Sequence, residues 1–309
     1  MTGDRPLAGI ALMLAFCLLA PLGDGLAKLL SGGTGLLVLM LARFGAQALL
    51  LAPACLARGE ALWPPRGTRA LMALRSLLHI GGMGFMFAAL RVLPLADALA
   101  IAFVMPFIAL LLGWLLLAEA VGLHRLGACA AGFVGTVLVI QPNFAAVGAA
   151  ALLPLGVALC LALFMLITRH LRGRIGAIRM QAISGWQAGA LVALALALWP
   201  APEFAALPAG RADWTILGAM AALGVIAQLS MTASLTLAPA ATLVPMQYLE
   251  IPFGVAIGWA LFGDLPDATA SAGIAITVAA GLYVIAREHR LSRPPMPPVA
   301  GSAAPGRTP

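Results

Sequence analysis

Ten long apolar stretches, separated by short connections, limit how this chain can fold more than any other feature. The stretches lie at roughly 7–27, 35–57, 70–90, 95–117, 123–140, 150–170, 180–199, 214–235, 240–262 and 269–287. A helix needs about 20 apolar residues to cross the hydrocarbon core of a bilayer. Strands of a membrane barrel alternate in polarity, and these stretches do not. The pattern predicts an all-α, polytopic membrane protein with ten transmembrane helices.

The composition agrees with a lipid environment. The 309 residues are 62% hydrophobic and 9% charged, with a mean hydropathy of +1.04, whereas soluble domains are about 25% charged. The four cysteines lie in different apolar stretches without metal-ligand spacing. We therefore expect no metal and no cofactor. The net charge of +7 comes from residues between the stretches, without the interleaved aromatic residues of a nucleic-acid-binding module, so we expect no nucleic-acid partner.

The basic residues also predict an orientation. If the N-terminus is cytoplasmic, thirteen arginines fall on the cytoplasmic side, while Arg91, Arg211 and Lys28 fall on the external side. Cytoplasmic connections of membrane proteins are enriched in Lys and Arg. We therefore expect a multi-pass protein of the cell inner membrane with both termini cytoplasmic, a cytoplasmic N-terminus at 1–6 and a Pro-rich, disordered tail at 291–309.

A weak internal repeat divides the chain. A shift of 145 residues lays 94–140 on 239–285 and matches Gly113-Trp114 with Gly258-Trp259 and Glu119 with Asp264. The shift predicts two five-helix repeats, 7–140 and 150–287. Because each repeat has an odd number of helices, the second must enter the membrane inverted. Inverted repeats are typical of alternating-access carriers, which bind their solute near the bilayer midplane between the halves.

Several short motifs occur in a characteristic order along residues 7–287. They are Gly23-Asp24-Gly25-Leu26-Ala27-Lys28, Arg43-Phe44, Arg75, Pro94-Leu95-Ala96, Pro106, Gly113-Trp114, Glu119 and Gly135-Thr136-Val137-Leu138-Val139-Ile140. With these motifs the sequence resembles the drug/metabolite transporter superfamily, in its EamA-type branch. The resemblance implies a ten-helix basket around a central cavity, with a small-molecule solute and membrane lipid as partners.

The resemblance leaves the solute and the direction of transport open. Export is the commoner direction in the family, so we expect a secondary transporter that exports an amino-acid-like or opine-like metabolite. The alternative is an importer of a vitamin or a nucleotide-like compound, such as riboflavin. Proton coupling and a homodimer also stay open.

Ionisable residues inside apolar stretches mark the candidate binding site, because burying them in a membrane is costly. Glu250 is the deepest, about 15 Å from the end of its stretch at 1.5 Å per residue, and Arg43 lies at a similar depth. With Gln247, Tyr248 and the more peripheral Arg75, these form the predicted substrate-binding set.

Trp186 in the seventh stretch completes that set. Each member also has a structural alternative. Glu250 could belong to a fixed ion pair, Arg75 could extend to the cytoplasmic surface, and Trp186 could join two helices.

Three further charges lie near the external ends of stretches. Asp24 and Lys28 are four residues apart on one helix face, and Asp97 is close to the start of the fourth stretch. We expect these residues to form a gate or an ion pair. The acids and bases within the stretches are balanced, so they can pair internally when no solute is bound.

Two other classes of protein fit less well. A membrane-embedded enzyme would carry a recognisable catalytic constellation, but the chain has no HExxH, GxSxG or Walker A motif, and no connection exceeds about fifteen residues. A channel usually builds its pore by oligomeric symmetry, whereas an inverted repeat places a site within one chain. We therefore expect a carrier and not an enzyme.

Overall fold

The computed structural model describes residues 6–105, 107, 108, 112, 123–171, 173–237 and 246–291, and all regular secondary structure there is helical. The long helices are α1 (Pro6–Leu30), α2 (Leu36–Leu56), α3 (Arg69–Leu90), α6 (Leu123–Val147), α7 (Leu153–Leu171), α8 (Ala177–Leu198), α10 (Arg211–Leu237) and α13 (Ala268–Leu291). Shorter elements are α4 (Leu95–Ala102), the 3-10 helix η1 (Gly148–Leu152), α9 (Pro202–Ala205) and α12 (Glu250–Phe262).

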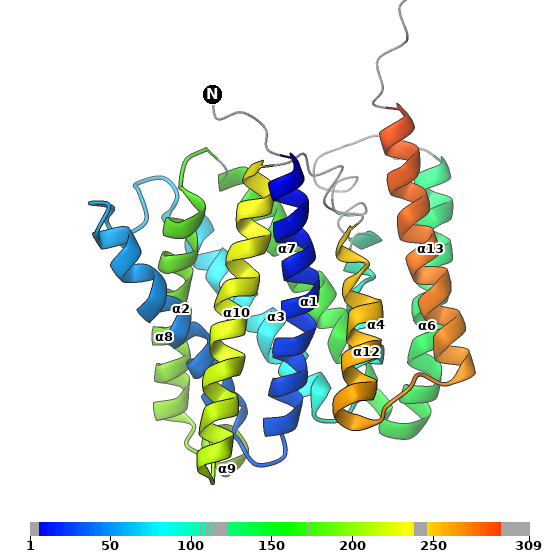
Figure 1. Ribbon diagram of the computed structural model, residues 1–309, viewed down its shortest axis with the longest axis horizontal. Coiled ribbons are helices and arrows are strands. Elements are labelled where there is room, and N and C mark those ends of the chain that lie inside the picture. The colour runs from blue at the N-terminus through cyan, green and yellow to red at the C-terminus, as the bar shows by residue number, and fades with distance from the viewer. Residues whose placement is uncertain are drawn as a thin grey trace, which may run out of the picture.

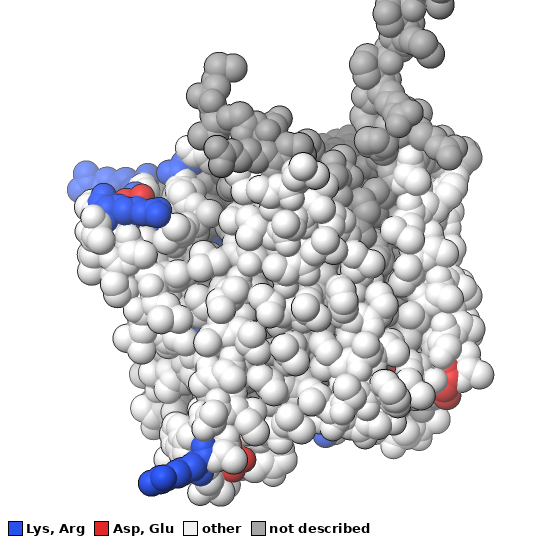
Figure 2. All heavy atoms as spheres, viewed as in Figure 1, with Lys and Arg blue, Asp and Glu red and all other residues white. Residues whose placement is uncertain are grey.

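Each of the ten predicted stretches contains one of these helices, and most helix ends agree within a few residues. Within the part of the chain that the structure describes, six helices are long and apolar enough to cross a membrane, and the apolar segments Ala130–Gln141, Glu250–Phe262 and Ala268–Ala280 are shorter. In Figure 2 the charged side chains gather at the two ends of the molecule and leave an uncharged band between them. The protein is therefore a polytopic, all-helical membrane protein.

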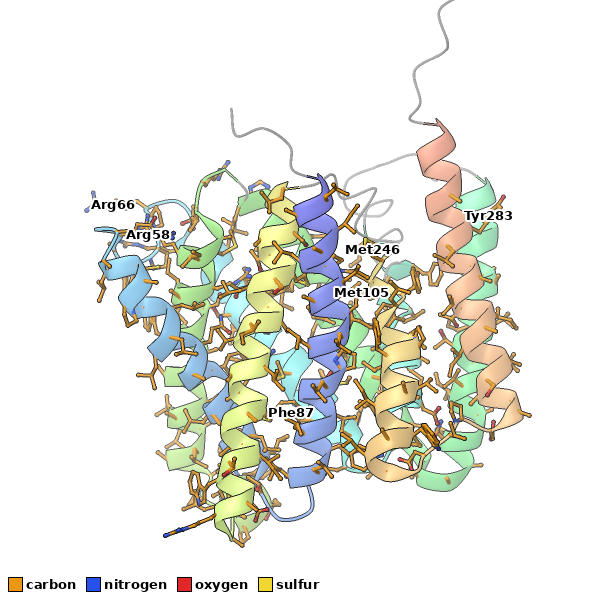
Figure 3. The ribbon with its side chains drawn as sticks, viewed as in Figure 1. Arg58, Arg66, Phe87, Met105, Met246 and Tyr283 are labelled. Carbon is orange, nitrogen blue, oxygen red and sulfur yellow. The ribbon has the colours of Figure 1, made fainter. Side chains whose placement is uncertain are left out.

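Equivalent helices of the two halves run in opposite directions. The start of α1 and the end of α13 lie on the same side of the molecule (Figure 1). Helix α1 runs away from that side, whereas α7, the first helix of the second half, runs back toward it. Arg58 and Arg66, in the connection after α2, mark the same side (Figure 3), which is the side predicted to be cytoplasmic.

The helix packing repeats when equivalent helices of the halves are exchanged. Helix α1 packs against α10 just as α7 packs against α3, and α2 packs against α10 just as α8 packs against α3. The pairs α2 with α8, α4 with α12, and α6 with α13 each join two equivalent helices. This is the contact pattern of two halves related by a twofold axis in the membrane plane. The boundaries 7–140 and 150–287 stay predictions.

Two helices are interrupted where the sequence predicted continuous spans. Helix α4 ends before a turn at Phe103 and Val104, and a turn at Tyr248 and Leu249 precedes α12. The two turns are 145 residues apart, the spacing of the predicted repeat. The rings of Phe103 and Tyr248 also meet, with centroids 5.5 Å apart. The equivalent interruptions therefore lie together between the halves. The predicted match of Trp114 with Trp259 and the position of Glu119 fall outside the described residues.

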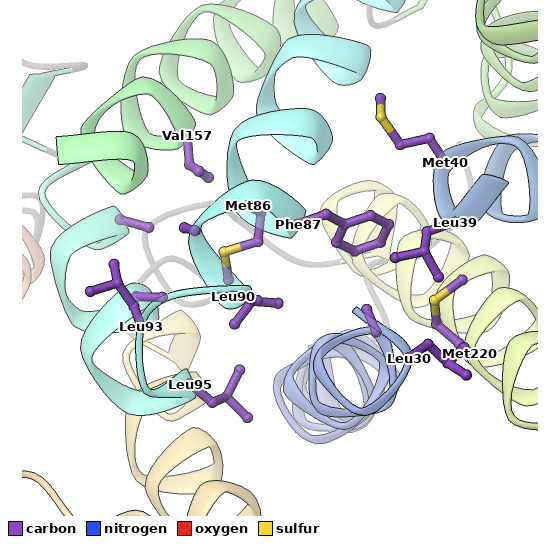
Figure 4. Close-up of a cluster of buried hydrophobic side chains, with 14 of the residues drawn as sticks. Leu30, Leu39, Met40, Met86, Phe87, Leu90, Leu93, Leu95, Val157 and Met220 are labelled. Carbon is purple, nitrogen blue, oxygen red and sulfur yellow. The ribbon is translucent and has the colours of Figure 1, made fainter. Parts of the chain in front are cut away.

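Small residues bring the helices close together. A Cβ added at Gly135 of α6 would lie 2.8 Å from the carbonyl oxygen of Gly273 in α13. Such contacts drive helix association in lipid, where the hydrophobic effect between helices is absent. The largest buried apolar cluster includes Leu30, Leu39, Leu90 and Met220, and it joins α1, α2, α3 and α10 (Figure 4).

Candidate solute-binding cavity

A cavity lies between the two halves. Its lining comes from α1, α3 and α4 of the first half and from the equivalent α7, α10 and α12 of the second, with Arg43 added from α2. About 1090 Å³ of its space is free of atoms, counting the part continuous with solvent. Alternating-access carriers bind their solute in this place, between the halves of an inverted repeat.

Aromatic rings and thioethers form a large part of the cavity wall, ten of the 24 described lining residues. The aromatic residues of the described lining are Phe16, Phe87, Phe103 and Phe164, and the methionines are Met83, Met86, Met105, Met165, Met220 and Met231. Phe87 and Met105 are marked in Figure 3. Aromatic faces stack on other planar rings, and methionine adapts its shape to a bound ring and makes favourable contacts with it. Such a wall is suited to a flat, mostly apolar molecule.

A few polar groups interrupt this wall. They are Asp24, Arg43, His79, Gln228, Gln247 and Glu250. The set contains two acids and one arginine. A small number of placed polar groups in an otherwise apolar pocket is the usual arrangement for orienting a ligand.

Arg43 keeps its N–H groups available to the cavity. Its charge interacts with that of Asp24, but in the described part of the chain no carboxylate oxygen lies within 4 Å of its nitrogens. No hydrogen bond from Arg43 to another described residue is present either. The guanidinium N–H groups can therefore donate hydrogen bonds to a bound solute.

Glu250 lies at the first turn of α12, directly after the interruption at Tyr248 and Leu249. It is 8% exposed and faces the cavity. The N-terminus of a helix favours a negative charge, which offsets part of the cost of burying the carboxylate. The neighbouring charge of Glu250 is that of Asp24 rather than that of Arg43. The two acids and Arg43 thus form a group in which Asp24 interacts with both partners.

Arg75 does not extend to the cytoplasmic surface. It is fully buried and donates hydrogen bonds to Thr168 Oγ1, at 2.8 Å, and to Ser184 Oγ. Its guanidinium also lies over the ring of Phe164, 4.1 Å from the centroid. Hydroxyl groups of α7 and α8 thus accept hydrogen bonds from the guanidinium. These hydrogen bonds lower the cost of burying its charge. Arg75 lies behind the cavity wall and is not part of the described lining.

Two other predicted residues lie outside the cavity lining. The indole N–H of Trp186 donates to the carbonyl of Leu62 at 2.7 Å, and its ring stacks on that of Trp63, with centroids 5.4 Å apart. Trp186 therefore fixes the connection between α2 and α3 to α8. Tyr248 is buried beside Phe103, whereas its neighbour Gln247 lines the cavity. The role of these residues in binding a solute stays a prediction.

The three predicted gate residues lie in two places: the charges of Lys28 and Asp97 interact, whereas Asp24 lines the cavity. Lys28 pairs with Asp264, at 2.7 Å, rather than with Asp24, and its amine lies over the ring of Phe262, 4.5 Å from the centroid. From the last turn of α1, the lysine side chain reaches the end of α12, while Asp24 faces the cavity. Asp97 accepts a hydrogen bond from Asn143 at 3.0 Å.

The structure adds residues that the sequence analysis did not single out. The Nδ1 atom of His79 is buried without a described hydrogen-bond partner, and its ring contacts those of Phe44 and Phe164. Gly224 of α10 lines the cavity beside Arg43. The thirteen methionines of the chain could have indicated a methionine-rich cavity wall. A methionine in an apolar stretch, however, does not reveal whether it faces a cavity or the lipid.

Comparisons with known proteins place the chain in a family. The sequence pattern of the EamA-like transporter family matches residues 7–141. A protein of Rhizobium johnstonii named riboflavin transporter is 33% identical over 223 residues, which are 72% of this chain and 72% of that protein. The chain belongs to the EamA-like transporter family. It is therefore a member of the drug/metabolite transporter superfamily, as the sequence motifs predicted.

Further relatives of this transporter carry the same name. A riboflavin transporter of Brucella anthropi is 29% identical over 240 residues, covering 74% of this chain and 82% of that protein. One of Vibrio cholerae is 26% identical over 222 residues, covering 70% and 71%. A solved crystal structure with 18% identity superposes with a TM-score of 0.62 over 93% of this chain and 98% of that one, which shows a shared fold.

Proposed function

We propose that this transporter carries riboflavin into the cell across the inner membrane by alternating access. The observation that supports this function most is the cavity wall of phenylalanines and methionines with a few polar groups. The names of the relatives from three bacteria support the same solute. Both favour the vitamin importer, the alternative of the sequence analysis, over the export of an amino-acid-like or opine-like metabolite.

The chemistry of riboflavin suits the cavity. Its fused ring system is flat and uncharged, and can stack on the aromatic wall. The ring carries carbonyl and nitrogen acceptors along one edge, which match the free N–H donors of Arg43. The same edge carries an imide N–H, for which His79 Nδ1 and the carboxylates of Asp24 and Glu250 are potential acceptors. The amides of Gln228 and Gln247 suit the hydroxyl groups of the ribityl chain.

An amino acid would leave most of this cavity wall unused. Its carboxylate and ammonium groups require two opposite charges at a fixed short separation, and most of its anchoring would come from charge. The described cavity lining holds such charges in Arg43, Asp24 and Glu250, but most of the wall is apolar. A small zwitterion would leave the aromatic and methionine surface without a partner.

Close packing at one end of the cavity supports alternating access. At the end nearer α9, a Cβ added at Gly25 of α1 would lie 3.1 Å from side-chain atoms of Ile257 and Leu261 in α12. The Lys28–Asp264 ion pair lies at the same end. By the predicted orientation this end is external, so we propose that rocking of one half against the other separates these contacts and admits the solute from outside.

The charge group of the cavity supports proton coupling. A solute that accepts hydrogen bonds from Arg43 draws on the cation that also interacts with Asp24. The repulsion between Asp24 and Glu250 is then less compensated, and protonation of Glu250 relieves it. Solute binding and proton uptake would therefore favour each other.

A thermal-stability screen of the purified protein tests the solute assignment. Riboflavin is compared with single amino acids and with an opine at matched concentrations. A ligand that binds only the folded state raises the melting temperature, so riboflavin should raise it and the zwitterions should not. Stabilisation by an amino acid or an opine, without an effect of riboflavin, would return the function to metabolite export.

A further inference from the structure

Arginines from both halves of the transporter gather at one end of α2, α3 and α8. The connection after α2, the first residue of α3, and the segment that leads into the first turn of α8 supply five described members, which we call the arginine patch: Arg58, Arg66, Arg69, Arg174 and Arg179. Within 57–69 and 173–179, Glu60 is the one acid. Figure 2 shows the blue atoms of this region at the upper left with little red beside them. Arg58 and Arg66 are marked there in Figure 3.

The connection 57–68, which carries part of the patch, is held in place by α8. Arg179 donates hydrogen bonds to the carbonyl oxygen of Ala61, at 2.8 Å, and to that of Trp63, at 3.2 Å. These bonds add to the contact of Trp186 with the same connection. Thr68 Oγ1 closes the last turn before α3 by donating to the carbonyl oxygen of Pro65 at 2.9 Å. The connection therefore presents its arginines on a fixed surface, and a ligand that binds there has little backbone left to order.

The charge of the patch is not neutralised by acids. Four of its arginines are exposed, and in the described part of the chain no carboxylate oxygen lies within 4 Å of the nitrogens of any of the five. The charges of Arg58 and Arg179, together with that of Glu60, all act on Cys55 in the last turn of α2. Positive charges of the first and the second half thus lie near one point, and they are complementary to an anion.

Apolar side chains connect the patch to the lipid-facing surface. Leu56 and Trp63 are 60% and 56% exposed. The guanidinium of Arg69 lies 6.0 Å from the centroid of the Trp63 ring, and Arg179 binds the carbonyl of the same tryptophan. Tryptophans at the ends of transmembrane helices are typical of the membrane–water interface, at the level of the lipid head groups. An anion in the patch therefore has an apolar surface beside it, which suits acyl chains and which a soluble anion would leave unused.

We propose that the arginine patch binds the phosphate head group of an anionic phospholipid, such as phosphatidylglycerol, between the connection 57–69 of the first half and the start of α8 in the second. Guanidinium groups bind phosphate oxygens in a bidentate manner, and basic clusters beside transmembrane helices attract anionic lipids. Phosphatidylcholine has the same phosphate but also a choline cation, which the arginines repel. The bound lipid joins the two halves at this end of the molecule, whichever solute the cavity carries.

Native mass spectrometry of the full chain in an uncharged detergent tests the proposal. It measures the Kd of the first bound phosphatidylglycerol, with phosphatidylcholine of the same acyl chains for comparison and inorganic phosphate as a competitor. One variant combines Arg58→Gln, Arg66→Gln and Arg69→Gln, and a second combines Arg58→Lys, Arg66→Lys and Arg69→Lys. Arg211→Gln is the control, because Arg211 is exposed at the start of α10, on the opposite side of the molecule (Figure 1). The melting temperature of each variant without lipid reports its folding.

We expect the wild type to bind phosphatidylglycerol at least about tenfold more tightly than phosphatidylcholine. A basic residue near the membrane surface contributes about fivefold to the binding of anionic lipid, so the triple glutamine variant should bind phosphatidylglycerol about 100-fold more weakly. The triple lysine variant keeps the charge, so its Kd should stay within about tenfold of the wild type. Arg211→Gln should leave the Kd unchanged.

Four results would overturn the proposal. Equal affinity of the wild type for the two lipids would show that the arginines serve membrane orientation alone. Wild-type affinity in the triple glutamine variant, or an equal loss in Arg211→Gln, would place the lipid elsewhere. A triple lysine variant that binds no better than the glutamine variant would show that the loss is not one of charge. Full displacement of the lipid by an equal concentration of inorganic phosphate would identify a site for a free anion.

Discussion

The Lys28–Asp264 pair should hold the external end of the cavity closed, and breaking it should expose the cavity to the outside more often. The pair joins the last turn of α1 to the segment after α12. If these elements separate when the transporter opens outward, the ion pair exists only in the closed state. Removing it then shifts the population toward the outward-open state by the free energy of the lost contacts.

The structure sets the size of this shift. The side chains of Lys28 and Asp264 are 16% and 36% exposed, so the ion pair belongs to the surface class and is worth about 0.2–1 kcal/mol. Asp264→Asn should raise the outward-open population by about 1.4- to 5-fold. Lys28→Met also removes the contact with the ring of Phe262, worth about 0.5–1 kcal/mol more. Its effect should therefore be larger, about 3- to 30-fold.

Cysteine labelling measures this population. Ala20 lines the cavity, so Ala20→Cys, in a background without the four native cysteines, reports access from outside to a membrane-impermeant maleimide. The labelling rate follows the open fraction while that fraction is small. Both variants should label faster, with Lys28→Met ahead, and exchanging the two residues should restore the original rate. An unchanged rate in both variants, or a larger effect of Asp264→Asn, would refute the gate.

The remaining predictions concern topology, the anchor, the helix crossing and coupling. Reporter fusions at Ala146 and Gly173 should lie on opposite sides of the membrane; the same side for both would contradict the ten-helix fold. Arg43→Lys keeps the charge but loses the planar fork, so riboflavin should bind about 10-fold more weakly; wild-type affinity would remove Arg43 as the anchor. Gly135→Ala should destabilise the purified protein by about 1–3 kcal/mol through overpacking, and an unchanged melting temperature would count against the close crossing of α6 and α13. Glu250→Gln mimics the protonated acid, so it should still exchange riboflavin between the two sides but lose the response to a pH gradient; a full response would leave Glu250 only a part of the cavity wall.

Much of the fold followed from the sequence, because lipid imposes simple rules on a chain. A segment that crosses the bilayer must be apolar and helical, so apolar length alone predicted most helix ends. The interruptions at Phe103 and Tyr248 were not predicted. The apolar pattern runs through Phe103 unchanged, and the polar residues Gln247 and Glu250 beside Tyr248 were interpreted as a binding site and not as a break in the helix. Hydropathy reports where a segment lies, not whether its backbone is continuous.

The polar residues of the cavity were easier to predict than the apolar ones. Arg43 and Glu250 stood out because charges inside a span are rare, and both line the cavity. The phenylalanines and methionines did not, because a helix that is apolar on all sides gives no sign of its inward face. The positions of Arg75 and Trp186 outside the described lining could not be predicted, because their partners, Ser184 and Leu62, come from distant segments that no local pattern connects. A role of either residue in solute binding stays a prediction.

The most direct test of the account is riboflavin counterflow in proteoliposomes. Vesicles that contain the purified transporter are loaded with unlabelled riboflavin and diluted into a trace of labelled riboflavin, beside vesicles without protein and vesicles loaded with an amino acid. A carrier with alternating access should accumulate the label transiently above its equilibrium level in the riboflavin-loaded vesicles, and uptake should saturate with concentration. Uptake equal to that of protein-free vesicles, or overshoot only with the amino acid inside, would contradict riboflavin transport.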